Sequence, residues 1–184
     1  MSRAYLLGAL HDATERDYTY RLSQNTEKYV DDIASLVESL GFDAWTYREG
    51  SNRDIYVVEF SKQVLDAFDV TALDEQRDYV QGYFDADGSV PKSPDARLYI
   101  YFAQKNRDDL LEVKRYLGDL GVETGTLHRP SKANAPEYWR FYVSTPSHEA
   151  FARKIGSRHP RKRDLLGKKV RSAPRRESGI TRTR

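Results

Sequence analysis

The chain has 184 residues, of which 39% are hydrophobic and 32% are charged, a composition that provides for a packed core and excludes a disordered chain. It contains no cysteine and only 4 scattered histidines, which excludes disulfides and thiolate zinc sites and leaves oxygen ligands for a hard metal ion such as Mg²⁺. The net charge of +2 divides into an acidic body and a basic segment over residues 156–184, a layout common among proteins that bind phosphate groups of nucleic acids.

No apolar run approaches the roughly 20 residues of a membrane helix. The first residues mix acids with bases, unlike a secretory or transit peptide. We therefore expect an intracellular protein, in the cytoplasm, the nucleoid or an organelle, that makes no membrane contact.

Two parts of the chain repeat one another. The segments YRLSQN (Tyr20–Asn25) and YFAQKN (Tyr101–Asn106) align so that Gln24 falls against Gln104, an offset of 80, and upstream Gly8 in YLLGALHD aligns with Gly82 in YVQGYFDAD. Repeats of this kind predict two related halves. We place them at residues 1–72 and 73–160, followed by a basic segment over 161–184 whose last stretch, RSAPRRESGITRTR, is expected to be disordered.

Each half has the same predicted order of elements. A short apolar helix is followed by a hairpin, an amphipathic helix ending at Leu-Gly, two further strands and a closing helix. In the second half we expect a strand from about Arg97 to Gln104. The predicted fold class is α+β, with two pseudo-symmetric αββαββα halves whose antiparallel sheets form a saddle.

The predicted strands alternate apolar and polar residues, so that one face of each sheet packs on helices and the other is polar. In the first half the outward set is expected to be Arg21, then Ala44, Thr46 and Arg48, then Val57 and Glu59. Two polar faces side by side suit a DNA groove, although a solvated face is the usual explanation for any single residue. The predicted DNA contacts are Arg21, Thr46, Arg48, Arg53, Lys92, Arg97, Tyr99, Tyr101, Lys105, His128, Arg129, Lys132, Arg140, Tyr142, Arg161 and Arg163.

The segment Val80–Gly88, VQGYFDADG, carries the chemistry. It leads from helix into turn, which places Asp85 and Asp87 at a helix C-terminus with Gly88 free to take a positive φ. A helix C-terminus already carries partial negative charge, so two carboxylates there lose stability unless a cation offsets them. The pattern indicates a metal site, and an ordinary Asp-Gly turn before a hairpin is the alternative.

This segment resembles the motif of the LAGLIDADG homing endonucleases, which it matches at Gly82 and from Asp85 to Gly88. The resemblance covers about residues 4–169 and implies a monomer that cuts double-stranded DNA at a long pseudo-symmetric target and leaves 3′ overhangs. It implies Mg²⁺ as the cofactor, with Mn²⁺ or Ca²⁺ able to replace it for binding. It also implies that Asp87 and the carbonyl of Ala86 bind this metal.

The resemblance further implies that two motif helices pack together between the halves, where Gly8 and Gly82 allow close approach. The first motif departs from the pattern, because the acid position counted from Gly8 falls on Ala13 and Asp12 lies one residue early. We predict that Asp12 is the second metal-binding acid, reached by a local change of winding. The alternatives are cutting of one strand only, loss of nuclease activity, and an Asp12 that merely ends the helix.

Three further roles come from the resemblance. Gln24 and Gln104 occupy the position of a polar residue that orients active-site water, although polarity at a helix entry would also explain them. Lys162 is the candidate for the basic residue near the scissile phosphate. The predicted catalytic set is therefore Asp12, Asp87, Gln24, Gln104 and Lys162.

Three functions compete at this point. The first is a site-specific DNA endonuclease. The second is a protein of the same fold that has lost cutting, such as an intron RNA maturase or a DNA-binding regulator, which the degenerate first motif supports. The third is a small α/β interaction domain whose acids only form turns, and the repeat and the basic segment argue against it.

Overall fold

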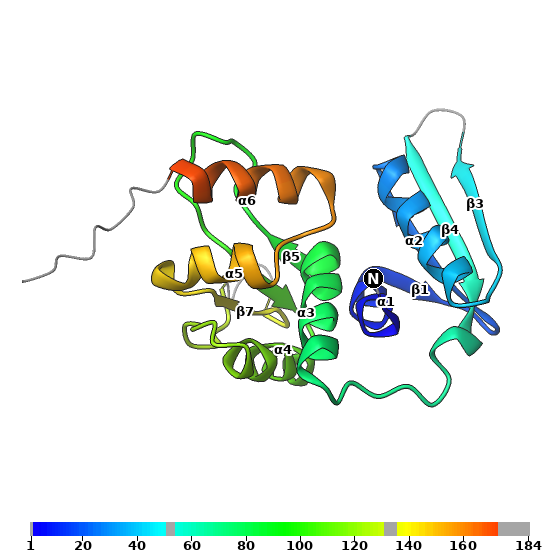
Figure 1. The fold of residues 1–184 in the computed structure, drawn as a ribbon, viewed down its shortest axis with the longest axis horizontal. Coiled ribbons are helices and arrows are strands. Elements are labelled where there is room, and N and C mark those ends of the chain that lie inside the picture. The colour runs from blue at the N-terminus through cyan, green and yellow to red at the C-terminus, as the bar shows by residue number, and fades with distance from the viewer. Residues whose placement is uncertain (1, 51–53, 131–135, 173–184) are drawn as a thin grey trace, which may run out of the picture.

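The computed structural model describes residues 2–50, 54–130 and 136–172 (Figure 1). The first half contains α1 (Arg3–Ala9), the 3₁₀-helix η1 (Leu10–Asp12), β1 (Ala13–Glu15), β2 (Thr19–Gln24), α2 (Glu27–Ser39), β3 (Ala44–Glu49), β4 (Ile55–Ser61) and the 3₁₀-helix η2 (Lys62–Leu65). The second contains α3 (Leu73–Asp87), β5 (Gly88–Ser89), β6 (Tyr101–Gln104), α4 (Arg107–Asp119), β7 (Trp139–Tyr142), the 3₁₀-helix η3 (Thr145–Ser147), α5 (His148–Lys154) and α6 (Pro160–Ser172).

Two antiparallel sheets confirm the predicted fold class. The strand orders are β1-β2-β4-β3 and β5-β6-β7, and each sheet packs one face on the helices of its own half. Some predicted elements are shorter: the closing helix of the first half is only η2, and β6 begins at Tyr101 rather than near Arg97, because its partner β5 has 2 residues. Between α4 and β7 the expected strand is reduced to two bridges, Thr124 with Val143 and His128 with Arg140.

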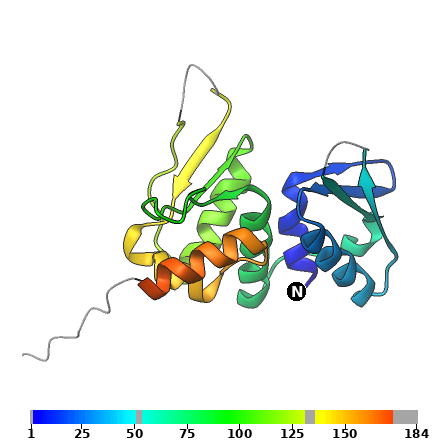
Figure 2. The same ribbon diagram turned by 90° about the horizontal axis from the view of Figure 1, so that it is seen from above.

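The two halves meet along α1 and α3, which lie side by side at the centre of the molecule (Figures 1 and 2). A Cβ atom built on Gly8 would lie 2.1 Å from the carbonyl oxygen of Tyr79, and one built on Gly82 would lie 2.0 Å from that of Tyr5. No larger residue fits at either position without separating the helices. The prediction that these two glycines allow the motif helices to approach is confirmed.

The faces of the first sheet follow from its register. Leu22 is buried in the core of this half and lies opposite Val58, which in turn lies opposite Thr46. Opposed residues of antiparallel strands share a face, so Ala44, Thr46 and Arg48 lie on the face covered by α2. Their predicted outward orientation is wrong by one position, and the open face of β3 instead carries Trp45, Tyr47 and Glu49.

The outward orientation predicted for Arg21 is confirmed, because it lies opposite Glu59 on the open face. The β3 error has a simple cause. Both alternating sets of AWTYRE contain polar and apolar side chains, so the alternation alone does not say which set is buried.

The start of the basic C-terminal segment belongs to the fold. Residues 160–172 form α6, and its Leu165 and Leu166 are buried in the core of the second half. The segment predicted as a tail thus begins with a helix that runs to residue 172 and packs on the second half through Leu165 and Leu166. Among the described helices, none combines the length and the apolar character required to cross a membrane.

Candidate active site at the ends of the paired helices

Asp87 is the last residue of α3, and its Oδ2 atom accepts a hydrogen bond of 2.7 Å from Nε2 of Gln104, the last residue of β6. The backbone that follows differs from the prediction, because Gly88 has a φ of −74° and needs no left-handed conformation. Glycine is required for space: a Cβ atom there would lie 2.0 Å from Cδ2 of Phe84.

The first motif reaches an equivalent geometry with one residue fewer. Gln24, at the end of β2, donates from Nε2 to Oδ2 of Asp12 over 2.7 Å. The difference is absorbed in η1, since a 3₁₀ residue advances the chain by about 2.0 Å and an α residue by about 1.5 Å. Four residues after Gly8 therefore span about the same length as five residues after Gly82.

The strand register supports this equivalence. Ala13, directly after Asp12, pairs with Leu22, whereas Gly88, directly after Asp87, pairs with Phe102. Leu22 and Phe102 are themselves equivalent in the repeat at the offset of 80 that aligns Gln24 with Gln104. The two acids thus hold corresponding positions, as expected if the end of the first helix is tightened.

The two carboxyl groups interact. The pKa of Asp87 is raised to about 6, chiefly by burial and also by the nearby charge of Asp12, while the hydrogen bond from Gln104 and the ammonium of Lys162 oppose the rise. Burial also raises the pKa of Asp12. Two carboxyl groups whose charged forms are disfavoured are set to gain from a bound cation.

Lys162 reaches this site from α6. Its side chain is only 5% exposed, and Nζ donates to the carbonyl oxygens of Phe84 at 2.6 Å and Asp85 at 2.9 Å. These carbonyls belong to the last turn of α3, where a positive charge is favourable. Burial lowers the pKa of Lys162 to about 8, so the ammonium form still predominates at neutral pH.

A pocket of about 400 Å³ lies beside the two helix ends. It is lined by Asp12, Gln24, Asn25, Thr26, Asp85, Ala86, Gly88, His159, Arg161 and Lys162. The described residues contain no group of three or more acids and histidines able to hold a metal ion alone. Two carboxylates and the carbonyl of Ala86 nevertheless fit a hard divalent ion that completes its shell with water and phosphate oxygens, as Mg²⁺ commonly does.

The other acid of the second motif has a different task. Asp85 is 2% exposed, and its Oδ2 atom accepts hydrogen bonds from the hydroxyl of Tyr5 at 2.7 Å and the backbone N–H of Arg158 at 2.9 Å, while its Oδ1 atom accepts one from Ser157. The Tyr5 hydroxyl also lies 3.1 Å from that of Tyr29. Asp85 therefore ties α3 to α1 and to the chain before α6.

A matching contact joins the first motif to the second half. Nε2 of His11 lies 2.9 Å from the hydroxyl of Tyr79, and Nδ1 lies 3.5 Å from Asp109. Burial lowers the pKa of His11 to about 4, so the ring is neutral at neutral pH. The two contacts are equivalent. Tyr5, three residues before Gly8, contacts Asp85, three residues after Gly82, and Tyr79, three residues before Gly82, contacts His11, three residues after Gly8. Sequence reasoning missed the contacts of Tyr5, Tyr79 and His11 and considered Asp85 only as an acid of a metal site, although the repeated Tyr-x-x-Gly spacing was visible.

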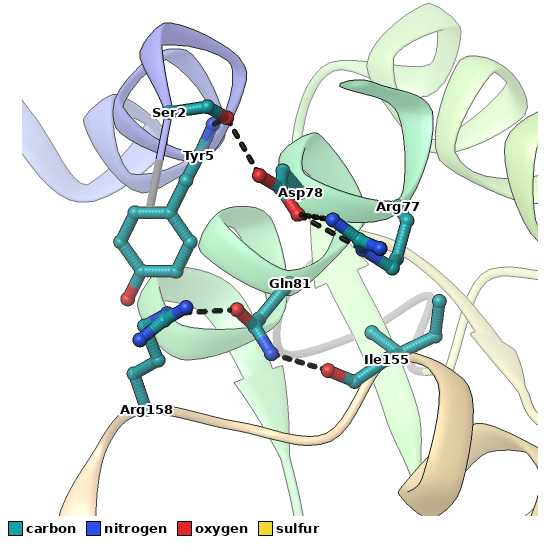
Figure 3. A network of polar contacts seen from close by, with 7 residues as sticks. All are labelled: Ser2, Tyr5, Arg77, Asp78, Gln81, Ile155 and Arg158. Atoms are coloured by element: carbon teal, nitrogen blue, oxygen red, sulfur yellow. Dashed lines mark hydrogen bonds and ion pairs between the residues drawn. The ribbon is translucent and has the colours of Figure 1, made fainter. Parts of the chain in front are cut away.

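Further polar contacts follow the same seam (Figure 3). The Ser2 hydroxyl donates to Asp78 at 2.7 Å. Nε of Arg158 donates to Gln81 at 3.0 Å, and Gln81 donates to the carbonyl of Ile155. The first bond ties the start of α1 to α3, and the bonds of Gln81 hold the chain before α6 against α3, which positions Lys162.

The structure separates the predicted DNA contacts into groups. Tyr101, His128, Arg140 and Tyr142 share the open face of the second sheet, and Tyr99 stacks on Tyr101 at its border. Arg21 is on the open face of the first sheet, whereas Thr46 and Arg48 are not. Exposed positions outside these faces are held by Lys92, Arg97, Lys105, Arg129, Arg161 and Arg163. Arg161 lines the pocket beside Asp12, while Arg163 lines another one between α5 and α6. Arg53 and Lys132 lie outside the described residues.

Comparison with known proteins follows the same division into halves. Residues 74–156 match the family model of the LAGLIDADG-like domain. The structure of I-DmoI in complex with DNA and Ca matches with a TM-score of 0.67 at 20% identity, covering 90% of this chain and 96% of that one. The complex of I-DmoI with DNA and Mn gives 0.65 at 20% identity, with 84% and 95% covered. Full-length DUF199/WhiA from Thermatoga maritima gives 0.63 at 12% identity, with 91% and 61% covered. No curated protein sequence matches the chain. The second half therefore carries a LAGLIDADG-like domain, and the two halves together have the LAGLIDADG homing endonuclease fold.

Proposed function

We propose that the protein is a site-specific endonuclease that cuts double-stranded DNA with the help of a divalent cation. The observation that carries the proposal is the pair of acids at equivalent helix ends, each bonded at 2.7 Å to the glutamine of its own half. One acid per half suits a duplex, in which each strand presents one scissile phosphate. The I-DmoI complexes with DNA and with Mn or Ca support this assignment.

Mg²⁺ is the proposed cofactor, with Mn²⁺ or Ca²⁺ able to replace it for binding. Such an ion activates water and neutralises charge that develops on the phosphate. Asp12 and Asp87 would hold it, helped by the Ala86 carbonyl. Gln24 and Gln104 fix the rotamers of these carboxylates through their side-chain amides, and the second N–H of each amide is the proposed group that orients water. Oε1 of Gln104 already accepts a hydrogen bond of 2.7 Å from the backbone N–H of Lys105. Lys162 adds positive charge beneath the phosphate position and keeps the end of α3 in place.

The proposed substrate is a long pseudo-symmetric duplex bound by one protein monomer, and the proposed product has 3′ overhangs. The polar face of the second sheet, with Tyr101, Arg140 and Tyr142, supplies contacts of the kinds that reach base edges and phosphates. The basic helix α6 adds phosphate contacts close to the acids.

The test uses a supercoiled plasmid in which the DNA sequences that flank the coding region are joined without it. We expect linear product with Mg²⁺ and none with a chelator. Nicked circles alone would show that only one acid is competent. Specific binding without any cleavage would reject the nuclease and favour a LAGLIDADG protein that acts as a DNA-binding regulator or as an intron RNA maturase. That alternative has some support in the fold, because the TM-score to DUF199/WhiA is close to that of the I-DmoI complexes.

A further inference from the structure

The open faces of the two sheets differ at equivalent positions. Arg21 of the first sheet is equivalent to Tyr101 of the second. Arg21 lies opposite Glu59, whereas Tyr101 lies opposite Tyr142. The neighbouring pair is Ser23 with Val57 in the first sheet, and Ala103 with Arg140 in the second. The first face thus pairs its cation with an acid, and the second pairs aromatic rings beside a cation.

Arg21 is held by groups of its own half. Its Nη2 atom lies 2.7 Å from Glu49, and its Nε donates to the Tyr47 hydroxyl at 3.2 Å. Glu59 in turn accepts from Thr19 at 2.6 Å and contacts Arg16 at 3.4 Å. To bind a DNA phosphate, Arg21 has to give up its carboxylate partner, which cancels most of the gain.

Arg140 is held by rings instead. Its guanidinium carbon lies 4.2 Å from the centre of the Tyr101 ring, and Nη1 lies 3.5 Å from the Tyr142 hydroxyl. No ion pair joins Arg140 to a carboxylate in the described part of the chain. Its Nε is buried without a hydrogen-bond acceptor, so the Nη atoms are the donors that a phosphate would meet. Arg129 is stacked in a similar way, 4.6 Å above the Trp139 ring. Ring contacts orient a guanidinium without neutralising it, so its N–H donors stay available for phosphate.

The distribution of charge along the chain also distinguishes the two halves. Residues 1–72 contain 7 Lys and Arg against 13 Asp and Glu, whereas residues 73–160 contain 13 of each and residues 161–184 contain 10 against 2. Residues 161–172, which belong to α6, contain 6 Lys and Arg against 1 Asp, and because α6 packs on the second half this positive charge lies on that side of the molecule. A polyanion therefore meets repulsion at the first half and attraction at the second.

We propose that the second half, through Arg140 and its ring-held neighbours, supplies most of the affinity for DNA, and that the first half contributes little to phosphate attraction. The two half-sites of a target then contribute unequally. The proposal rests on DNA being the ligand, as in the proposed function, but it does not depend on cleavage. A cation that is already paired with a carboxylate gains less from a DNA phosphate, because that pair has to be broken first. On the described open faces Arg21 is paired in this way with Glu49, whereas Arg140 is held by the Tyr101 ring.

The test compares Arg140→Gln with Arg21→Gln, two matched losses of one positive charge from equivalent sheets. Binding of a fluorescent 30-bp duplex of random sequence is measured by anisotropy at several salt concentrations, in EDTA so that no cleavage occurs. We expect Arg140→Gln to weaken binding about five- to tenfold and to reduce the salt slope by about one. Arg21→Gln should change the affinity less than twofold, and Glu49→Gln, which frees Arg21, should increase it.

Circular dichroism melts verify that each variant folds. The proposal would be overturned if Arg21→Gln lost as much DNA affinity as Arg140→Gln, or more. It would also be overturned if Glu49→Gln left binding unchanged or weakened it, or if the parent protein did not bind DNA. The outcomes are separate from those of the proposed function. A protein that binds unequally but never cuts refutes only the nuclease, whereas one that cuts but responds equally to both variants refutes only the unequal halves.

Discussion

Removing the charge of Asp87 should make the protein more stable while it destroys the site. Because the pKa of Asp87 is raised to about 6 from 3.8, the folded state disfavours the ionised carboxylate above that pH. A shift of this size corresponds to about 3 kcal/mol, and solvent screening of a partly exposed group reduces it to about 1–2 kcal/mol. Asp87→Asn keeps an acceptor for Gln104, so we expect this gain at pH 7.5 and a rise in Tm of about 2–8 °C.

The assay is thermal unfolding in EDTA across pH. The sign follows from linkage: a raised carboxyl pKa lowers stability as pH rises from about 4 to 6, so the advantage of Asp87→Asn should vanish below pH 4. Added Mg²⁺ should raise the Tm of the parent protein and not that of the variant. The control is Asp85→Asn, which should destabilise the protein because it weakens a buried acceptor of three hydrogen bonds. An Asp87→Asn variant less stable than the parent at pH 7.5 would refute this reasoning.

Three further predictions concern the helix pair. Gly82→Ala should cost about 3 kcal/mol in chemical unfolding, since its Cβ atom would lie 2.0 Å from a backbone oxygen; Gly118→Ala, with open space around it, should stabilise, and equal effects would contradict the packing. Because the pKa of His11 is lowered to about 4, the free energy of unfolding should fall by about 2 kcal/mol as pH falls from 6.5 towards 4. His11→Gln should reduce this pH dependence in urea titrations, and the same pH dependence in the variant and the parent protein would contradict the prediction. Lys162→Met should raise the pKa of Asp87 further in NMR titration, because a cation that opposes the rise is lost. An unchanged pKa would show that the charge of Lys162 does not act on Asp87.

Much of the fold could be predicted because the pattern repeats. The Gly8 and Gly82 alignment, the Leu-Gly helix ends and the Asp-Ala-Asp-Gly segment are local signals with direct structural causes. They gave the central helix pair and the position of Asp87 at the end of α3.

Other features depend on contacts that have no local signal. The orientation of β3 is set by pairing with β4, so AWTYRE alone did not reveal that Thr46 and Arg48 face α2. Lys162 is 77 residues from Asp85 in sequence, and only the packing of α6 shows that it binds the last turn of α3. The one-residue offset of Asp12 was visible, but its compensation by η1 was one of several alternatives until the strand register was known.

The most direct test of the paired acids is plasmid cleavage by Asp12→Asn beside Asp87→Asn, with Mg²⁺ and the joined flanking sequence as target. If Asp12 and Asp87 are equivalent, each single variant should lose linear product at least about 100-fold, as expected when a group acting on the transition state is removed. Binding in EDTA should be largely retained in both. Linear product from Asp12→Asn at the rate of the parent protein would contradict the paired site.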